Sequence, residues 1–195
     1  MTRTDTTAAA VQGAFADPAR DASRVFRAAL QAMSRPGRIE TVSGAVPPAP
    51  VSVAAGALLL TLCDGDTGVF LAPSHDTPDL RAWITFHTGA PLVGPDAAVF
   101  ALGAWGALQP LSRFAVGTAD YPDRSATLIV ERDMLDPTGA RLTGPGIADT
   151  ARLNLPETGA FAANRSRFPL GLDFYFTCGG RLAAVPRSTR VEEDA

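Results

Sequence analysis

The chain has 195 residues, of which 46% are hydrophobic and 19% charged, so it can bury a core and is too apolar for a disordered protein. Its formal net charge of -3 excludes a general electrostatic attraction to nucleic acid or anionic lipid, and no apolar run approaches the ~18 residues of a membrane span. All 17 basic residues are arginine, which excludes a pyridoxal-phosphate aldimine on lysine and a P-loop.

The first sixteen residues are polar and alanine-rich, and we expect them to form a flexible segment before a single domain over residues 17–195. Cys63 and Cys178 lie far apart in the sequence, and we expect both to be thiols in the reducing cytoplasm. A structural disulfide between them is the alternative. The composition therefore predicts one cytoplasmic domain without a redox role.

A helix is predicted to begin at Asp17-Pro18, with aspartate as N-cap and proline at the first helical position. Residues at helical spacing make one apolar face, formed by Val25, Phe26, Ala29, Leu30 and Met33. The helix should end at Ser34-Arg35-Pro36-Gly37, because proline disfavours the helical conformation of its predecessor and glycine permits a sharp reversal. A short strand over residues 39–42 is predicted next.

The middle of the chain predicts helices and strands in alternation. Residues 53–63 are nearly all apolar, which favours a helix buried against a sheet. A second helix should begin at Thr77-Pro78 and reach about Phe86. A short strand is predicted over residues 69–72, and buried strands are predicted over residues 97–102 and 126–131.

Near the C-terminus, residues 172–178 and 181–185 flank Gly179-Gly180, a two-residue connection that suits a primed turn. We therefore expect a C-terminal β-hairpin. Together with the preceding alternation of helices and strands, it predicts an α/β fold, a mixed β-sheet with helices packed on it.

Metal binding finds little support in the sequence. His75 and His87 are the only histidines, and neither cysteine has the spacing that would complete a tetrahedral zinc site. The segment Asp64-Gly65-Asp66-Thr67-Gly68 begins like a calcium loop, but His75 occupies the position of the bidentate glutamate. We interpret this segment as an acidic turn after a helix, and we expect no metal site.

Nucleophilic catalysis finds no complete motif, since neither G-x-S-x-G nor C-x-x-C is present. His87, beside Thr88, is a weak candidate for a general base, and the alternative is a partly buried histidine bonded to backbone. Thr143-Gly144-Pro145-Gly146 matches no nucleotide-binding pattern and is interpreted as a tight turn. The catalytic residues are therefore unknown from the sequence.

Arginines beside predicted loops are the best candidates for anion binding. Arg35 and Arg38 bracket the Pro-Gly turn, and Arg187 and Arg190 follow the last predicted strand. A planar guanidinium can hold a phosphate or carboxylate through two hydrogen bonds. The alternative is that these side chains are simply solvated.

Several segments taken together resemble one protein family. They are Phe26-Arg27, Ala32-Met33-Ser34-Arg35-Pro36-Gly37, Leu60-Thr61-Leu62 with Asp64 and Asp66-Thr67, Phe86-His87-Thr88-Gly89-Ala90-Pro91-Leu92-Val93, Arg141-Leu142-Thr143-Gly144-Pro145-Gly146-Ile147, Phe168-Pro169-Leu170-Gly171-Leu172-Asp173, Thr177-Cys178-Gly179 and Pro186-Arg187-Ser188-Thr189-Arg190-Val191-Glu192. Over residues 24–192 the chain is similar to the bacterial phosphonate metabolism proteins of the PhnH family, the H subunits of the carbon-phosphorus lyase complex. Ser188 departs from the family, which usually has a second threonine there.

The resemblance implies a fold similar to that of pyridoxal-phosphate-dependent transferases, without the cofactor and its site. It also implies self-association as a dimer and assembly with the G, I and J subunits, of which J carries the iron-sulfur radical chemistry. The L subunit joins transiently. With G, I and L, the H subunit takes part in the displacement of adenine from ATP by methylphosphonate, which gives alpha-D-ribose 1-methylphosphonate 5-triphosphate.

The segments predict substrate-binding candidates at Arg35, Arg38, Thr88, Arg187 and Thr189, all near predicted element ends, where binding groups usually lie. A purely structural scaffold without substrate contact is the alternative function. A free-standing hydrolase would need a nucleophile or metal cluster that the sequence does not offer. Whether the candidate segments meet in space is the question that the fold must answer.

Overall fold

A six-stranded mixed sheet runs through the centre of the computed structural model, which describes residues 11–193. In order across the sheet, its strands are β1 (Glu40–Thr41), β8 (Arg181–Val185), β7 (Asp173–Cys178), β4 (Thr127–Glu131), β3 (Phe100–Ala104) and β2 (Val69–Leu71). The strands β2, β3, β4 and β7 are parallel, while β8 and β1 add antiparallel pairings at one side. The predicted α/β fold with a mixed sheet is thereby confirmed.

The side chains of the central strands alternate between two buried faces. On β4, Leu128 and Val130 belong to the core on one face, and Ile129 belongs to the core on the other. On β7, Tyr175 faces the same way as Ile129. This period of two, with both faces apolar, is what a strand covered on both sides requires.

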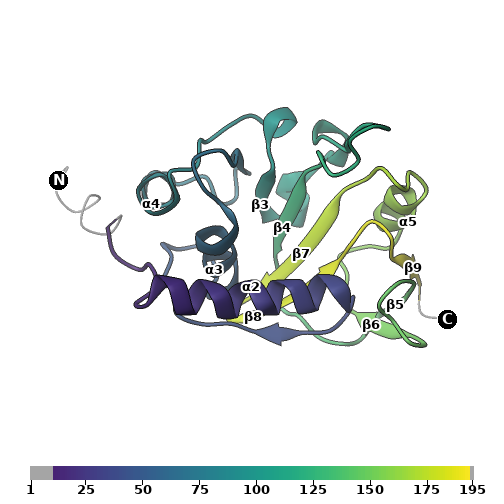
Figure 1. Cartoon of the computed structure of the whole chain (residues 1–195). Helices are drawn as coiled ribbons and strands as arrows, with labels where there is room; N and C mark the ends of the chain where they lie inside the picture. The colour runs from purple at the N-terminus through teal and green to yellow at the C-terminus, as the bar shows by residue number, and fades with distance from the viewer. Residues whose placement is uncertain (1–10, 194–195) are drawn as a thin grey trace.

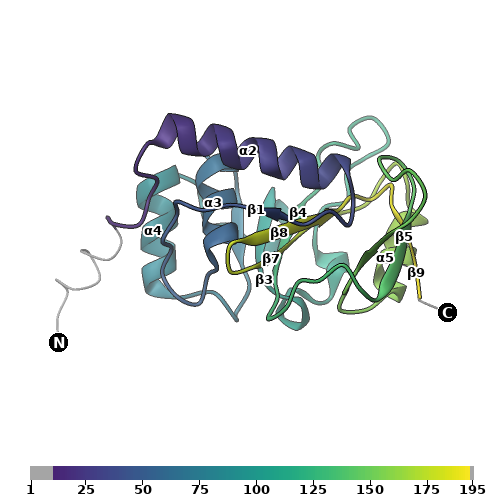
Figure 2. The same ribbon diagram turned by 90° about the horizontal axis from the view of Figure 1, so that it is seen from below.

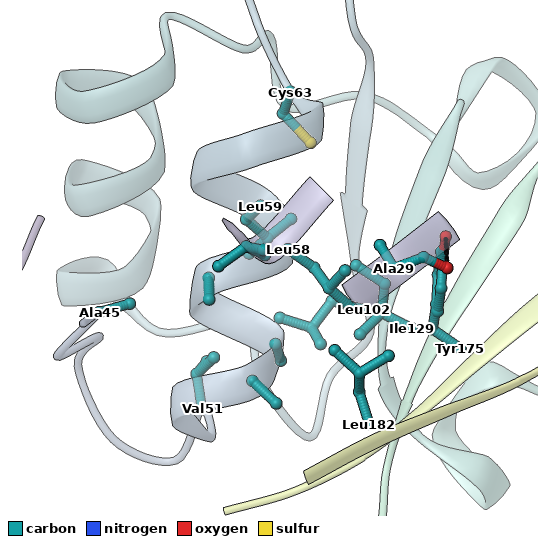
Figure 3. Packing of buried hydrophobic residues seen from close by; sticks show 14 of the residues in the cluster. Ala29, Ala45, Val51, Leu58, Leu59, Cys63, Leu102, Ile129, Tyr175 and Leu182 are labelled. Atoms are coloured by element: carbon teal, nitrogen blue, oxygen red, sulfur yellow. Dashed lines mark hydrogen bonds between the residues drawn. The ribbon is translucent and has the colours of Figure 1, made fainter. Parts of the chain in front are cut away.

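Three helices cover one face of the sheet (Figures 1 and 2). They are α2 (Pro18–Ser34), α3 (Val53–Leu62) and α4 (Pro78–Thr88). The centre of this layer is α3, whose Leu58 and Leu59 are fully buried and lie toward Leu102, Ile129 and Leu182 of the sheet (Figure 3). Burying a leucine side chain contributes about 1.5–3 kcal/mol, so α3 is a main source of stability.

A second, three-stranded antiparallel sheet covers the other face together with a short helix. In order, its strands are β6 (Ala151–Leu153), β5 (Ala140–Thr143) and β9 (Arg190–Glu192), and the helix is α5 (Gly159–Arg165). Figures 1 and 2 place this unit at the opposite end of the molecule from α4. The sequence predicted none of these four elements.

The helix α2 begins as predicted, because the Asp17 side chain accepts a hydrogen bond from Arg20 N–H at 3.3 Å. Its predicted apolar face needs correction. Val25 and Ala29 are buried, whereas Phe26 and Leu30 are 53% and 55% exposed. The inward face is set by the small residues, and the two large side chains lie one turn apart on the solvent side.

The strands β7 and β8 pair antiparallel, with Cys178 opposite Arg181 across the Gly179-Gly180 connection. Gly179 has φ +56°, while Gly180 does not have positive φ, which is the sign pattern of a type II′ turn. The pair is not the end of the fold, since β9 follows and joins the second sheet. The likeness to pyridoxal-phosphate-dependent transferases stays a prediction.

Two predicted boundaries shift. The strand expected over residues 97–102 begins later, at Phe100, because the 3₁₀ helix η1 (Pro95–Ala97) precedes it. The flexible segment expected over residues 1–16 also needs correction at its end, because Phe15 is buried and Gly13 O accepts a hydrogen bond from Val46 N–H at 2.8 Å.

Residues 1–10 lie outside the described residues. No helix described over residues 11–193 is long and apolar enough to cross a membrane.

Candidate functional site

The end of α2 carries the first candidate residues. Arg35 is the C-cap, and its N–H donates to Gln31 O at 3.0 Å. Gly37 follows with φ +85°, and a Cβ built there would lie 3.0 Å from the Leu142 side chain. The turn predicted by Pro36-Gly37 therefore forms, and it is pressed against the second sheet.

A groove opens at this junction, with a volume of about 350 Å³. Three arginines line it, namely Arg35, Arg38 and Arg152. Arg38 Nε lies 2.5 Å from Glu40 Oε1, and Arg152 Nη1 donates to Gly139 O at 3.4 Å. Within residues 11–193, the exposed Arg35 side chain makes no hydrogen bond or ion pair. The Arg35 guanidinium thus offers the groove a positive charge and hydrogen-bond donors of the kind that suit oxyanions.

The predicted tight turn at Thr143-Gly144-Pro145-Gly146 forms the neighbouring wall. A Cβ at Gly146 would lie 1.9 Å from Ser34 O, so only glycine fits there. This close approach joins the turn to the end of α2. The sequence predicted both turns but gave no sign that they meet.

Thr189 packs on the same turn. A Cβ at Gly144 would lie 3.2 Å from Ser188 O and 3.6 Å from Thr189 Cα. Thr189 is 2% exposed, and its hydroxyl has no hydrogen-bond partner within the described chain. Three segments far apart in the sequence, around Arg35, Gly144 and Thr189, therefore come together.

Arg187 does not line this groove. Its Nε donates to Asp173 Oδ1 at 3.1 Å, and its Nη1 donates to Pro122 O at 2.6 Å. Nη2 donates to Asp173 Oδ2 at 2.5 Å and also to the Ser125 hydroxyl. Because its donors are already bonded within the protein, we assign Arg187 to holding the loops beside β7.

His87 and Thr88 lie at the C-terminal end of α4. His87 Nε2 is 3.2 Å from Gln12 O, and its ring contacts the rings of Trp83 and Phe86. Thr88 Oγ1 donates to Ile84 O at 2.7 Å. Figures 1 and 2 place α4 at the end of the molecule opposite the second sheet, so these two candidates do not meet Arg35 and Arg38.

Residues 64–68 form the acidic turn that the sequence predicted. Asp64 Oδ1 accepts hydrogen bonds from Thr67 Oγ1 at 2.7 Å and from Asp66 N–H at 3.0 Å. These two bonds hold the pKa of the Asp64 carboxyl below its ordinary value, and the bond from Thr67 has the larger effect. Over residues 11–193 no three His, Cys, Asp or Glu side chains gather in a group that could hold a metal ion.

A buried carboxylate at the end of β4 was missed by the sequence analysis. Glu131 Oε1 accepts a hydrogen bond from Ser52 N–H at 2.7 Å, and Oε2 accepts from Thr177 Oγ1 at 3.0 Å. Burial raises the pKa of the Glu131 carboxyl above its ordinary value, and these bonds oppose the shift. The signal that the sequence offered for this buried carboxylate was a glutamate at the end of the apolar run over residues 126–131. Its contact with α3 links the sheet to the first turn of that helix.

The fold and the groove define a small α/β protein with an arginine-lined groove on its surface. The chain belongs to the PhnH family of bacterial phosphonate metabolism proteins, whose family model matches residues 13–192. The resemblance inferred from the sequence is thereby confirmed.

Two proteins with known names are similar in sequence to this chain. It is 42% identical over 194 residues to the alpha-D-ribose 1-methylphosphonate 5-triphosphate synthase subunit PhnH of Rhizobium meliloti (strain 1021), covering 93% of this chain and 96% of the relative. It is 28% identical over 174 residues to HtxG of Stutzerimonas stutzeri, named as a candidate C-P lyase subunit protein, covering 85% and 83%. Both alignments span most of each chain, so they concern the whole fold.

Proposed function

We propose that this chain is a cytoplasmic subunit of the carbon-phosphorus lyase complex. In this proposal it acts with the G, I and L subunits in transferring methylphosphonate to the ribose of ATP with release of adenine. It assembles with G, I and J and pairs with a second copy of itself, while L joins transiently. The observation that carries the proposal is the 42% identity, across nearly the whole length of both chains, to a relative named as a subunit of that synthase.

The groove supplies a reason for this subunit to contact substrate. ATP and methylphosphonate both carry phosphorus oxyanions, and guanidinium groups bind such oxygens through charge-assisted hydrogen bonds. Arg35 and Arg38 both line the groove, and both are exposed. We therefore assign these two arginines to holding a phosphate or phosphonate group, with no cofactor of the subunit's own.

Reconstitution tests the assembly and the reaction together. The chain is combined with G, I and L subunits, ATP and methylphosphonate, and adenine release is measured. We expect release to fall to background when the chain is omitted. Unchanged release without it would contradict the proposal.

A charge-removing variant tests the groove. Arg35→Gln should lower turnover at least about tenfold, since a hydrogen bond to a charged group contributes about 1.5–3 kcal/mol. The matched control is Arg20→Gln, because Arg20 is an exposed arginine of α2 whose Nε lies 3.8 Å from Asp17. Equal turnover of the two variants, with assembly intact, would remove the groove from the mechanism.

Exposed apolar side chains favour a second candidate function, a scaffold without substrate contact. Phe26 and Leu30 lie side by side on α2 and are each more than half exposed. Another subunit could bury them. Replacing both with serine should then abolish assembly while the isolated chain stays folded, whereas Val99→Ser, at a 44% exposed valine elsewhere, should not.

A further inference from the structure

An open pocket lies at the edge of the central sheet where β3 and β4 begin. Its volume is about 360 Å³, and it shares no lining residue with the arginine groove. Residues 96–99, which lead from η1 into β3, form one part of its wall. The other part is formed by Ala115 and by residues 123–125, which precede β4.

Much of this wall is apolar. Three alanines and one valine contribute to it, namely Ala97, Ala98, Val99 and Ala115. Val99 is 44% exposed, so an apolar side chain at the wall is open to water. A ligand with methylene groups would remove Val99 from water together with its own chain, which favours binding.

Two aspartates bring negative charge to the same pocket. Asp96 and Asp123 are both exposed, so a ligand can reach their carboxylates. Within residues 11–193, neither side chain makes a hydrogen bond or an ion pair. No contact inside the described chain therefore compensates the two charges.

The nearby arginines do not cancel this charge. Among the described lining residues only Arg124 is cationic, and its guanidinium carbon lies 4.1 Å from the centroid of the Tyr121 ring, outside the lining. With two aspartates and one arginine, the formal charge of the lining is -1. Arg187 bonds the Ser125 hydroxyl, but Asp173 compensates its charge. The lining therefore favours a cationic ligand.

Bonds within the chain fix both parts of the wall. Ala126 N–H donates to Ala115 O at 2.8 Å, and Thr127 N–H donates to Val99 O at 2.8 Å. Arg187 Nη1 donates to Pro122 O at 2.6 Å, next to Asp123. The pocket is therefore preformed, and a ligand does not have to order the chain that holds it.

Charge and apolar lining together define the ligand class. We propose that this pocket binds an aliphatic diamine or polyamine. One ammonium group pairs with Asp96 and another with Asp123, while the methylene chain between them lies on Val99 and the alanines. A cavity of about 150 Å³ holds a molecule the size of benzene, so this larger pocket has room for such a chain. The inference goes beyond the proposed function and does not depend on it.

Nuclear magnetic resonance titration of the full chain, labelled with ¹⁵N, tests the site at low ionic strength. The probes are the diamine cadaverine, the monoamine n-pentylamine, and Nα-acetyllysine methylamide, which stands for a lysine of another protein. We expect saturable shifts at residues 96–99 and 123–125. Cadaverine should bind at least about threefold more tightly than either monoamine, which is the effect of one further exposed ion pair.

The other results would overturn the proposal. Without saturable shifts at these residues, the pocket is no site for amines. If n-pentylamine bound as tightly as cadaverine, the two carboxylates would not act together on one ligand. If the lysine derivative bound as tightly as cadaverine or more tightly, the pocket would be a contact for a lysine of another protein instead.

Three variants make the assignment specific. Asp96→Asn and Asp123→Asn keep the shape of the side chain, and each should weaken cadaverine binding about threefold, or about tenfold when combined. The matched control is Asp120→Asn, at an exposed aspartate of the same loop that does not line the pocket, and its affinity should not change. Unchanged affinity in the combined variant would refute the site. Equal weakening by Asp120→Asn would show a diffuse attraction to an acidic chain and would also refute it.

Discussion

Arg187 and Asp173 form a two-pronged ion pair, with Nε 3.1 Å from Oδ1 and Nη2 2.5 Å from Oδ2. Their side chains are only 13% and 21% exposed. Removing one partner of a buried pair leaves an uncompensated charge, so Arg187→Ala should lower the free energy of unfolding by about 3–5 kcal/mol. Urea denaturation measures this change.

The matched control for that pair is Arg141, which lies 3.5 Å from Glu192 with both side chains about half exposed. Arg141→Ala should change the free energy of unfolding by no more than about 1 kcal/mol, because water screens the pair. If Arg187→Ala were as stable as the native chain but inactive in the reconstituted complex, Arg187 would be a substrate ligand instead.

The Glu131 carboxyl predicts an unusual dependence of stability on pH. Burial raises its pKa in the folded chain. The folded state therefore binds the proton more tightly than the unfolded state, and its stability should fall as pH rises from about 4.3, the ordinary glutamate value, through the raised pKa. Urea denaturation at several pH values, with Glu131→Gln as the reference, isolates this contribution. A native chain that gains stability relative to the variant across that range would contradict the assignment.

Gly146 is expected to be intolerant of any side chain. Its φ is +82°, and a Cβ would lie 1.9 Å from Ser34 O, so Gly146→Ala should cost about 3 kcal/mol or more through strain and displacement of the turn. Thermal denaturation measures the loss. Gly106→Ala is the control, because Gly106 has no atom within 4 Å of such a Cβ. Equal melting temperatures would mean that the contact between the turn and α2 is not tight.

Cys63 should be almost inert in the folded chain. Burial, and secondarily Asp64, raises the pKa of its thiol to about 12, so only about one molecule in 10⁴ is the reactive thiolate at pH 8. Cys178 is partly exposed. Alkylation with iodoacetamide followed by mass spectrometry should label Cys178 first and Cys63 only after unfolding. Equal labelling rates under native conditions would contradict this order.

Thr189→Val tests the buried hydroxyl beside the groove. Because that hydroxyl is unpaired within the described residues, an apolar replacement of the same shape should leave the free energy of unfolding unchanged or raise it. A loss of turnover in the reconstituted complex with stability retained would give the hydroxyl a role in binding. Ser188→Ala, at the neighbouring residue, is the control for that measurement.

Elements with local signals were predictable from the sequence. The Asp17-Pro18 start and the Pro36-Gly37 end bound α2, and the apolar runs gave α3, β4 and β7. The strands β6 and β9 have three residues each, too few for a readable period, and their pairing joins distant segments. The face of α2 was wrong at Phe26 and Leu30, because periodicity identifies apolar residues without telling whether small or large ones pack inward.

The candidate site was predictable only in part. The turn at Arg35 and Arg38 was identified from glycine, proline and charge, and it lines the groove. Its meeting with Gly146 and Thr189 depends on nonlocal packing that no spacing encodes. Arg187 was chosen as a cation near a loop, but its partner Asp173 lies fourteen residues earlier, at the start of β7, so the sequence could not show that the two side chains are paired.

The helix α2 packs on β7 and β8, which are made late in the synthesis of the chain. Tyr175 Oη donates to Ala29 O at 3.3 Å, and Val42 N–H donates to Gly180 O at 2.8 Å. During synthesis, residues 11–45 leave the ribosome well before β7 and β8 exist, so those of their side chains that pack on these two strands stay uncovered until the strands emerge. A nascent chain halted before residue 173 should depend on chaperones, since its first helix lacks the two strands β7 and β8 on which it packs.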